Sequence, residues 1–201
     1  MPLPAPEART PLHTRTTVFR GFRRHDQLWD IEGELLDIKA KVLPIPGEDA
    51  ISPGEPLHGM AIRVTIDDQF VIHAINVTMD ATPHRECPQA QASMQSMVGC
   101  TMGRGWRQAI EHNLGGICGC THLRELLFNM ATVAFQTLAN ELADDNSQHP
   151  PPFFGTCSTW DFNGPVVARL YPQFVGWQPG TKTAAKPLSN RCELVTAGLH
   201  S

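Results

Sequence analysis

Hydrophobic and polar residues alternate with a period of two through most of the first eighty positions, and this pattern predicts β-strands. The strands are expected at residues 14–24, 28–41, 59–66 and 69–80. Tight turns are expected at His25-Asp26 and at Asp67-Asp68, whereas the proline-rich segment 42–56 is an irregular connection. The pattern therefore predicts two hairpins that form one antiparallel sheet of about four strands.

After Pro83 the hydrophobic period changes to that of an α-helix. Helices are expected over residues 88–98, 106–114 and 121–144. In the longest of these, apolar residues recur three and four positions apart, which predicts one wide apolar face buried against the sheet. Strands followed by helices are typical of an α+β domain, here with three helices covering one face of the sheet.

The two ends of the chain differ in composition from this part. Residues 1–12 are rich in proline and alanine and are expected to form a flexible arm. Residues 148–201 have three consecutive prolines near their start, at 150–152, and are expected to form an irregular covering arm, which leaves 13–147 as the core domain. A chain of 201 residues with 41% hydrophobic and 18% charged residues fits one such domain with tails.

The charge balance restricts the partners. Sixteen Lys and Arg residues against twenty Asp and Glu residues give a net charge of -4, so no basic footprint for nucleic acid or for an anionic membrane surface is present. No apolar run reaches the roughly 18 to 20 residues that span a bilayer, and the first residues lack the pattern of a signal peptide. We expect a cytoplasmic protein that acts on a small molecule, with a homodimer as one open option.

The densest group of sulfur and polar side chains precedes the last predicted helix. Free N–H groups at a helix start favour the thiolate form of a nearby cysteine such as Cys120, and a thiolate binds metals. His122 and Glu125 share one helix face, and with Asp30 they are candidates for proton transfer. The alternative is structural: Thr121 caps the helix, His122 bonds a carbonyl group and the cysteines are buried.

Two further residues, His58 and Cys87, stand where predicted elements begin. The run from Gly54 to Cys87, followed by helices and by Gly-Cys-Thr-His-Leu-Arg-Glu-Leu, resembles the core of the iron-sulfur scaffold proteins of the NifU and IscU type. In those proteins three cysteines hold zinc or a cluster. The resemblance places the three ligand positions on His58, Cys87 and Cys120.

The chain departs from that family at important positions. The first ligand is a histidine, the neighbouring aspartate of the family falls on Met60, and Gly119 stands where the family has a histidine. Mixed nitrogen and sulfur ligands favour zinc with an open fourth position over cluster assembly. An iron-sulfur cluster stays open as the alternative cofactor.

Sequence motifs also indicate a second family. The chain is similar to the bacterial family DUF2889 from about His13 to Thr137. The similarity rests on His13-x-Arg15, the Arg-x-Asp-x-Leu-Trp-Asp of 24–30, the Gly-Glu-Pro-Leu-His-Gly-Met of 54–60 and Gly-Cys-Thr-His-Leu-x-Glu-Leu of 119–126. The chain is identified as a member of this family on those motifs, and membership implies no function.

Two functions follow from these residues. The first is a zinc-dependent lyase, hydratase or hydrolase, in which His58, Cys87 and Cys120 hold the ion and its fourth position polarises a small, largely apolar, oxygen-bearing substrate. The second is an iron-sulfur or metal scaffold, or a sulfur acceptor that uses Cys120. A purely structural zinc, closed by His122 or Cys118, stays open as a third option.

Overall fold

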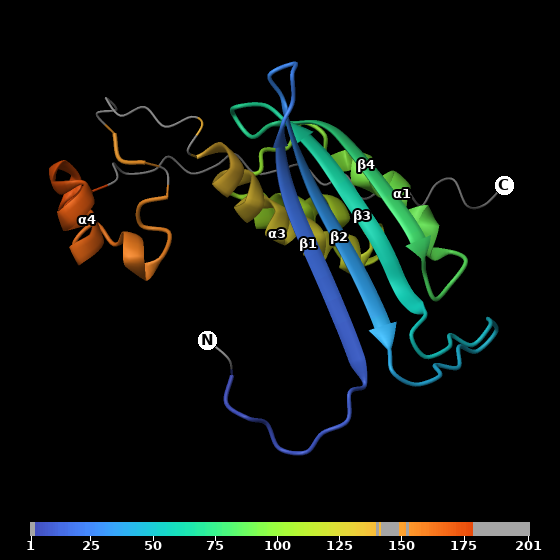
Figure 1. Ribbon diagram of the computed structural model, residues 1–201. Coiled ribbons are helices and arrows are strands. Elements are labelled where there is room, and N and C mark those ends of the chain that lie inside the picture. Colours follow the sequence, from blue (N-terminus) through green and yellow to red (C-terminus); the bar gives the residue numbers. More distant parts are fainter. Residues whose placement is uncertain (1–2, 140, 142–148, 152, 179–201) are drawn as a thin grey trace. The chain divides into compact units, whose positions relative to one another are not determined.

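The computed structural model describes residues 3–139, 141, 149–151 and 153–178 (Figure 1). The chain divides into two compact units, and the boundary between them follows Leu138. The predicted end of the core domain at residue 147 lies outside the described residues, as do residues 148, 152 and 179–201 of the expected C-terminal arm. Residues 3–12 contain no helix or strand and are exposed.

The first unit is built on a four-stranded antiparallel sheet with strand order β1-β2-β3-β4. The strands are β1 (His13–Arg23), β2 (Trp29–Lys39), β3 (Pro56–Ile66) and β4 (Ile72–Ala81). Each neighbouring pair in the sheet is also consecutive in the chain, so both expected hairpins occur. The predicted sheet and the α+β class are confirmed.

The turn between β3 and β4 is longer than expected. The Asp67 carboxylate accepts hydrogen bonds from the backbone N–H groups of Gln69 (2.8 Å) and Val71 (3.0 Å). Phe70 adopts a left-handed backbone conformation with a φ of 61°. These local bonds hold residues 67–71 in a closed turn, so β4 begins at Ile72 and not at Gln69.

Helical segments lie on one face of this sheet (Figure 1). They are η1 (Cys87–Gln89), α1 (Ala90–Ser93), η2 (Met94–Met97), α2 (Trp106–Leu114), η3 (Gly116–Cys118) and α3 (Thr121–Leu138). The expected helix at 88–98 is thus a run of short turns, whereas the other two expected helices begin where the sequence pattern placed them. The last of these was expected to reach residue 144, but it ends at Leu138 and Ala139 is already part of a turn. Helix α3 contacts β1, β2 and β3 and buries the apolar face that its periodicity predicted.

The approach of α3 to the sheet depends on two glycines. A side chain at Gly21 of β1 would overlap the Thr137 hydroxyl, and one at Gly33 of β2 would lie 3.1 Å from the Met130 sulfur. The helix can therefore pack directly on the backbone of the first two strands.

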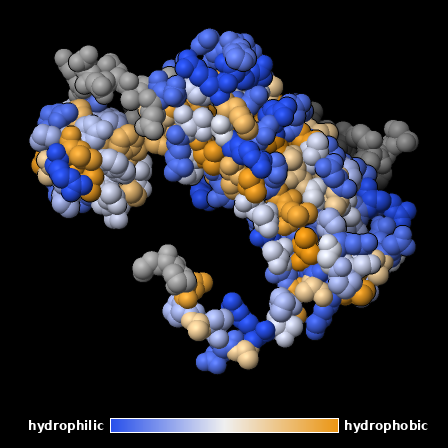
Figure 2. All heavy atoms as spheres, in the orientation of Figure 1, coloured by the Kyte–Doolittle hydropathy of each residue, from blue (hydrophilic) through white to orange (hydrophobic). Residues whose placement is uncertain are grey.

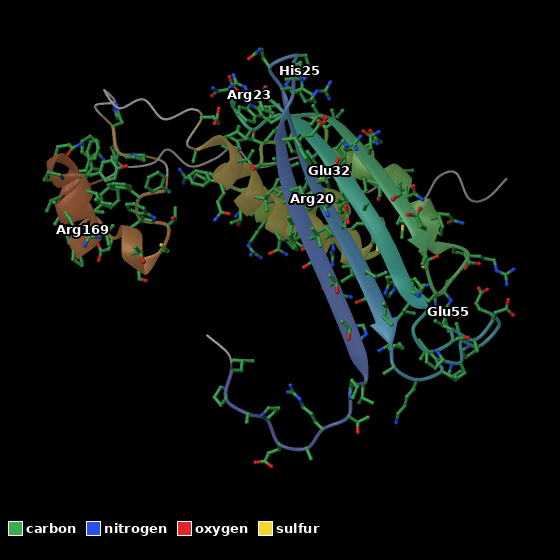
Figure 3. All side chains as sticks on the ribbon, in the orientation of Figure 1. Arg20, Arg23, His25, Glu32, Glu55 and Arg169 are labelled. Carbon is green, nitrogen blue, oxygen red and sulfur yellow. The ribbon has the colours of Figure 1, made fainter. Side chains whose placement is uncertain are left out.

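The opposite face of the sheet carries paired charges. Arg20 and Glu32 are labelled on β1 and β2 in Figure 3. Arg20 pairs with Glu34, and Arg63 pairs with Glu32 at 2.7 Å. The hydrophilic residues around the β1–β2 turn dominate the upper end of the surface in Figure 2. Within the described part of the chain no helix is both long and apolar enough to cross a membrane.

The second unit has an apolar cluster of its own. It contains η4 (Ser158–Trp160), α4 (Pro165–Leu170) and η5 (Pro172–Phe174), which pack around buried Phe154, Val167 and Phe174. Short helices therefore occur inside the segment that was expected to be irregular. Proline and glycine punctuate these turns but do not prevent them, because Pro165 and Pro172 stand at helix starts, where a missing N–H group costs nothing.

Candidate metal centre

A row of polar side chains crosses the helix-covered face of the sheet near one end. Asp37 of β2 lies opposite Arg15 of β1 and opposite His58 of β3 in the strand register. Directly opposed residues point to the same side of a sheet. Because Asp37 has the same parity as buried Trp29, this row faces α3.

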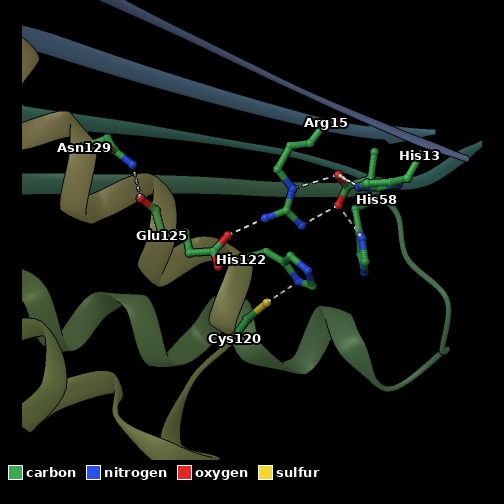
Figure 4. A network of polar contacts seen from close by, with 8 residues as sticks. His13, Arg15, His58, Cys120, His122, Glu125 and Asn129 are labelled. Carbon is green, nitrogen blue, oxygen red and sulfur yellow. Dashed lines mark hydrogen bonds and ion pairs between the residues drawn. The ribbon is translucent and has the colours of Figure 1, made fainter. Parts of the chain in front are cut away.

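Asp37 is the centre of this row. Its side chain is 1% exposed and both of its oxygens accept hydrogen bonds. Figure 4 labels the partners His13, Arg15 and His58. Arg15 binds it through Nε at 2.8 Å and Nη2 at 2.7 Å, His58 Nδ1 lies at 2.9 Å, and His13 Nε2 at 3.2 Å. Burial raises the pKa of Asp37, but the bonds from Arg15 and His58 outweigh it and lower the pKa to about 2. Asp37 is therefore a carboxylate at neutral pH.

The carboxylate fixes the orientation of His58. An ionised carboxylate can only accept hydrogen bonds, so Nδ1 of His58 is the donor. Nε2 is then the ring nitrogen that is left for another partner. This arrangement, a carboxylate holding the far nitrogen of an imidazole, is the one that orients histidine ligands in metal sites and histidine bases in hydrolases.

Cys120, His122 and Glu125, at the start of α3, face this row (Figure 4). Cys120 occupies the cap position, because its carbonyl accepts the backbone N–H of Arg124 at 3.0 Å, and the expected cap at Thr121 is wrong. The Cys120 sulfur lies 3.7 Å from Nδ1 of His122. Burial raises the pKa of the Cys120 thiol, but hydrogen bonds from His122 and from the backbone N–H groups of Leu123 and His122 lower the pKa overall.

The two histidines bring the sheet and the helix together. The ring centroids of His58 and His122 are 3.9 Å apart, with an angle of 37° between the rings. In the described residues, one group of candidate metal ligands has all of its ligating atoms within 4.8 Å of one another, and it consists of Asp37, His58 and His122. A histidine from β3 and a histidine from α3 are thus close enough to share an ion.

Charge at this place is dominated by anions. Glu125, one turn after His122, accepts a hydrogen bond from Nη1 of Arg15, which also binds Asp37. Asp37 and Glu125 are two carboxylates beside one guanidinium. A divalent cation would balance the excess negative charge.

The structure gathers most of the residues that the sequence singled out. His58, His122 and Glu125 join the cluster directly or through Arg15, and Cys120 contacts His122. Cys87 does not belong to the group of close ligands. It lines a pocket together with Cys120 instead.

Asp30 is not brought to this cluster. It lies on β2 seven residues from Asp37, about 23 Å along the strand, and on the other face of the sheet. There it accepts hydrogen bonds from the Thr65 hydroxyl at 2.6 Å and from Arg24 at 3.4 Å. An acid/base role for Asp30 next to His58 is therefore wrong.

Sequence reasoning missed Asp37 and the inward direction of Arg15 and His13. The signal was available in the alternation of β2, where Trp29, Ile31 and Leu35 form the buried set. Asp37 follows Leu35 by two positions, so the same alternation points its side chain inward. A carboxylate at an inward position of a strand requires partners, which the His-x-Arg motif supplies.

Comparison with known proteins identifies a family and nothing further. Residues 13–136 match the family model described as "Protein of unknown function (DUF2889)". No match was found among curated proteins or among solved structures. The matched range contains every residue of the cluster.

Proposed function

The chain belongs to the DUF2889 family, whose function is unknown, and we propose from its site that it is a zinc-dependent enzyme. The ligands are His58, His122 and Cys120, and the ion's open position takes water or the oxygen of a small substrate. The observation that carries the proposal is the contact between two histidines, one held by the buried Asp37 carboxylate and one beside a cysteine sulfur.

Ligand distances support this set. Zinc binds sulfur at about 2.3 Å and nitrogen at about 2.0 to 2.1 Å, so a tetrahedral S–Zn–N pair is separated by about 3.6 Å. The Cys120 sulfur and Nδ1 of His122 are 3.7 Å apart. Cys120 lies outside the group whose atoms are all within 4.8 Å, so its sulfur must turn toward His58 when the ion binds.

Asp37 fits a supporting role better than a ligand role. Its oxygens already carry two bonds from Arg15 and one from His58. A carboxylate that holds the second nitrogen of a histidine ligand makes the ligand more basic and fixes its direction. This proposal changes two of the roles expected from the sequence. His122 is a metal ligand and not a proton-transfer group, and Cys87 is part of the pocket wall and not a metal ligand.

Zinc with an open position supplies a Lewis acid or a metal-activated water, which suits lyase, hydratase or hydrolase chemistry. Glu125 is the group of this chain that can exchange protons with such a site. Its side chain is 46% exposed and is held by Arg15, which points its carboxylate toward the cluster. A small-molecule substrate remains the proposed partner.

Metal analysis of the full chain, purified without an affinity tag, tests the proposal. We expect one zinc per chain, and we expect the His58→Ala, His122→Ala and Cys120→Ser variants each to lose it. Cobalt replacement should give a sulfur-to-metal absorption band in the near ultraviolet that Cys120→Ser removes. No stoichiometric metal in the parent protein would overturn the proposal, as would full retention of metal by His58→Ala and His122→Ala.

His73→Ala is the matched control. His73 also pairs with an aspartate, Asp67, through Nε2 at 2.7 Å, but it is half exposed and has no second histidine in contact among the described residues. This variant should keep its zinc. Loss of zinc from His73→Ala would mean that removing any histidine-aspartate pair disturbs the fold.

A sulfur-acceptor or cluster-scaffold role is the second candidate, and one observation favours it. Cys120 has a lowered pKa and lines the same pocket as the free thiol of Cys87. This role predicts a persulfide on Cys120 or visible absorption after anaerobic reconstitution with iron and sulfide. A colourless protein that retains one zinc excludes the cluster version.

A further inference from the structure

A pocket opens next to the proposed metal centre. Its walls come from two segments. Residues 84, 86, 87, 89, 90, 92 and 93 belong to the segment that leads from β4 through η1 into α1, and residues 117–120 lead into α3. Its volume is about 770 Å³, within the range of about 300 to 1,000 Å³ typical of small-molecule sites. The pocket reaches Cys120, so it meets the metal centre at a shared side chain.

The walls of the pocket are mostly small or apolar. Ala90, Ala92, Cys87 and Gly119 leave space between the two segments. Gly119 holds its segment close to α2, because a side chain there would lie 2.8 Å from the Leu114 carbonyl oxygen. This close packing fixes where Cys120 ends the pocket.

The rim of the pocket carries an apolar side chain with no cover among the described residues. Ile117 is 97% exposed and lines the pocket opening. A ligand that extends to the rim would remove its apolar surface from water. The side chain thus favours a ligand with an apolar body.

Charge on the walls selects against anionic ligands. The described residues that line the pocket include Glu86 and His84 but no lysine or arginine, and Arg85 pairs with Glu48 instead. A phosphate or carboxylate group would therefore lack a lysine or arginine partner and would face the Glu86 carboxylate. The polar groups that are present, such as Gln89 and Ser93, can serve an uncharged ligand.

We propose that this pocket is the substrate subsite, and that it binds an uncharged compound with an aromatic or short acyl body whose carbonyl or hydroxyl oxygen lies at the Cys120 end. That the substrate oxygen binds the zinc ion rests on the proposed zinc function. The binding of the apolar body does not, since the pocket walls contain neither His58 nor His122.

The test uses Cys87 as a reporter inside the pocket. Benzyl methanethiosulfonate and methyl methanethiosulfonate are both uncharged and both form a mixed disulfide with a thiol, releasing methanesulfinate. We expect the ratio of their rates, benzyl over methyl, to be about tenfold higher at Cys87 than at Cys157, because a phenyl ring buries apolar surface in the pocket. Cys157 is an exposed free thiol of the second unit and serves as the reference. Mass spectrometry of proteolytic peptides reads each site separately.

Ala92→Trp fills the pocket and should bring the ratio at Cys87 to the value at Cys157. Ala92 is exposed in α1, so the larger side chain can be placed without entering the core. Ala74→Trp, at an exposed position of β4, is the control and should leave the ratio unchanged. Equal ratios at Cys87 and Cys157 in the parent chain would overturn the proposal, as would an unchanged ratio in Ala92→Trp.

In His58→Ala, which is expected to lose its zinc, the ratio at Cys87 should stay high. Metal analysis together with the same measurement on the parent chain separates this proposal from the proposed function. A ratio that stays high while the parent chain binds no metal would overturn the zinc function and support the subsite. Bound zinc with equal ratios would overturn the subsite and support the zinc function.

Discussion

At the scale of single residues, the site depends on an anion kept out of water. A buried carboxylate is costly unless charged partners and hydrogen bonds compensate it. Asp37 is compensated by bidentate Arg15 and by two histidines. Its removal would leave Arg15 and His58 without the acceptor that positions them.

We predict that Asp37 makes stability depend on pH in acid. Its pKa is about 2 in the folded chain against a usual value of 3.8, so the folded state favours its ionised form. The stabilisation is complete above pH 3.8 and is lost as the pH falls through about 2. At 1.36 kcal/mol per pKa unit it amounts to about 2 kcal/mol.

Urea denaturation of the parent chain and of Asp37→Asn, measured between pH 7 and pH 2, tests this prediction. The variant should be less stable at pH 7, and the difference should shrink below pH 4. Asp26→Asn is the control, since that exposed carboxylate lies outside the cluster. A difference that stays constant down to pH 2 would contradict the assignment of the charge to Asp37.

The contrast between Asp30 and Asp37 shows how far sequence reasoning reaches for residues. Both lie on one predicted strand, and an odd number of positions separates them. Alternation therefore puts them on opposite faces, and the apolar residues Ile31 and Leu35 identify the inner one. The motif around Cys120 led to the correct helix start, whereas Asp37 belonged to no motif and required the strand pattern to be followed to its end.

At the scale of elements, strong hydrophobic periodicity was sufficient to predict which strands and helices form. It did not predict the turns that depend on local hydrogen bonds. The strands and α3 follow long repeats, so their existence and type could be predicted. The 67–71 turn depends on one carboxylate accepting two backbone N–H groups, and the 87–97 segment has short helical turns in place of one helix. Such local structures depend on single side chains and not on the hydrophobic period of the segment.

We predict that adding a side chain at Gly21 destabilises the fold, because α3 lies close to β1 there. A Cβ atom at this position would overlap Thr137, so Gly21→Ala should destabilise the fold by about 1 to 3 kcal/mol, the usual cost of overpacking. Thr137→Ala in the same chain should recover part of the loss. The free energy of unfolding in urea is the measurement.

Gly103→Ala is the matched control for that substitution. The nearest atom to a Cβ at Gly103 is 3.7 Å away, an ordinary contact, and the change should be close to neutral. If Gly21→Ala were as stable as the parent chain, α3 could not lie as near to β1 as described.

At the scale of the whole molecule, the cluster joins distant parts of the first unit. His13 and Glu125 are more than a hundred positions apart, yet both reach the same Asp37–Arg15 pair. No local sequence pattern predicts this contact, because it depends on the strand register and on how α3 packs against the sheet. This is the physical reason why the sequence pointed to individual ligands and not to the Asp37–Arg15 pair that joins them.

The proposed zinc ion would tie β3 to α3, and this gives a prediction for the whole chain. A ligand that binds only the folded state stabilises it by about 2.7 kcal/mol at one hundred times its dissociation constant. Removal of the ion by a chelator should therefore speed hydrogen exchange in peptides from 54–66 and 119–126. Peptides from 153–178 should be unaffected, since that range belongs to the second unit with its own buried cluster.

Hydrogen exchange read by mass spectrometry separates these ranges in one experiment. The chelator should have no effect on His58→Ala, whose exchange in the first unit should already equal that of the chelated parent, whereas His73→Ala should respond as the parent does. Equal acceleration in both units would show a general effect of the chelator, and no acceleration in either would mean that no ion links the sheet to α3. The pattern across the chain therefore distinguishes a metal that holds two elements together from one bound at the surface, because a surface ion would leave exchange in β3 unchanged.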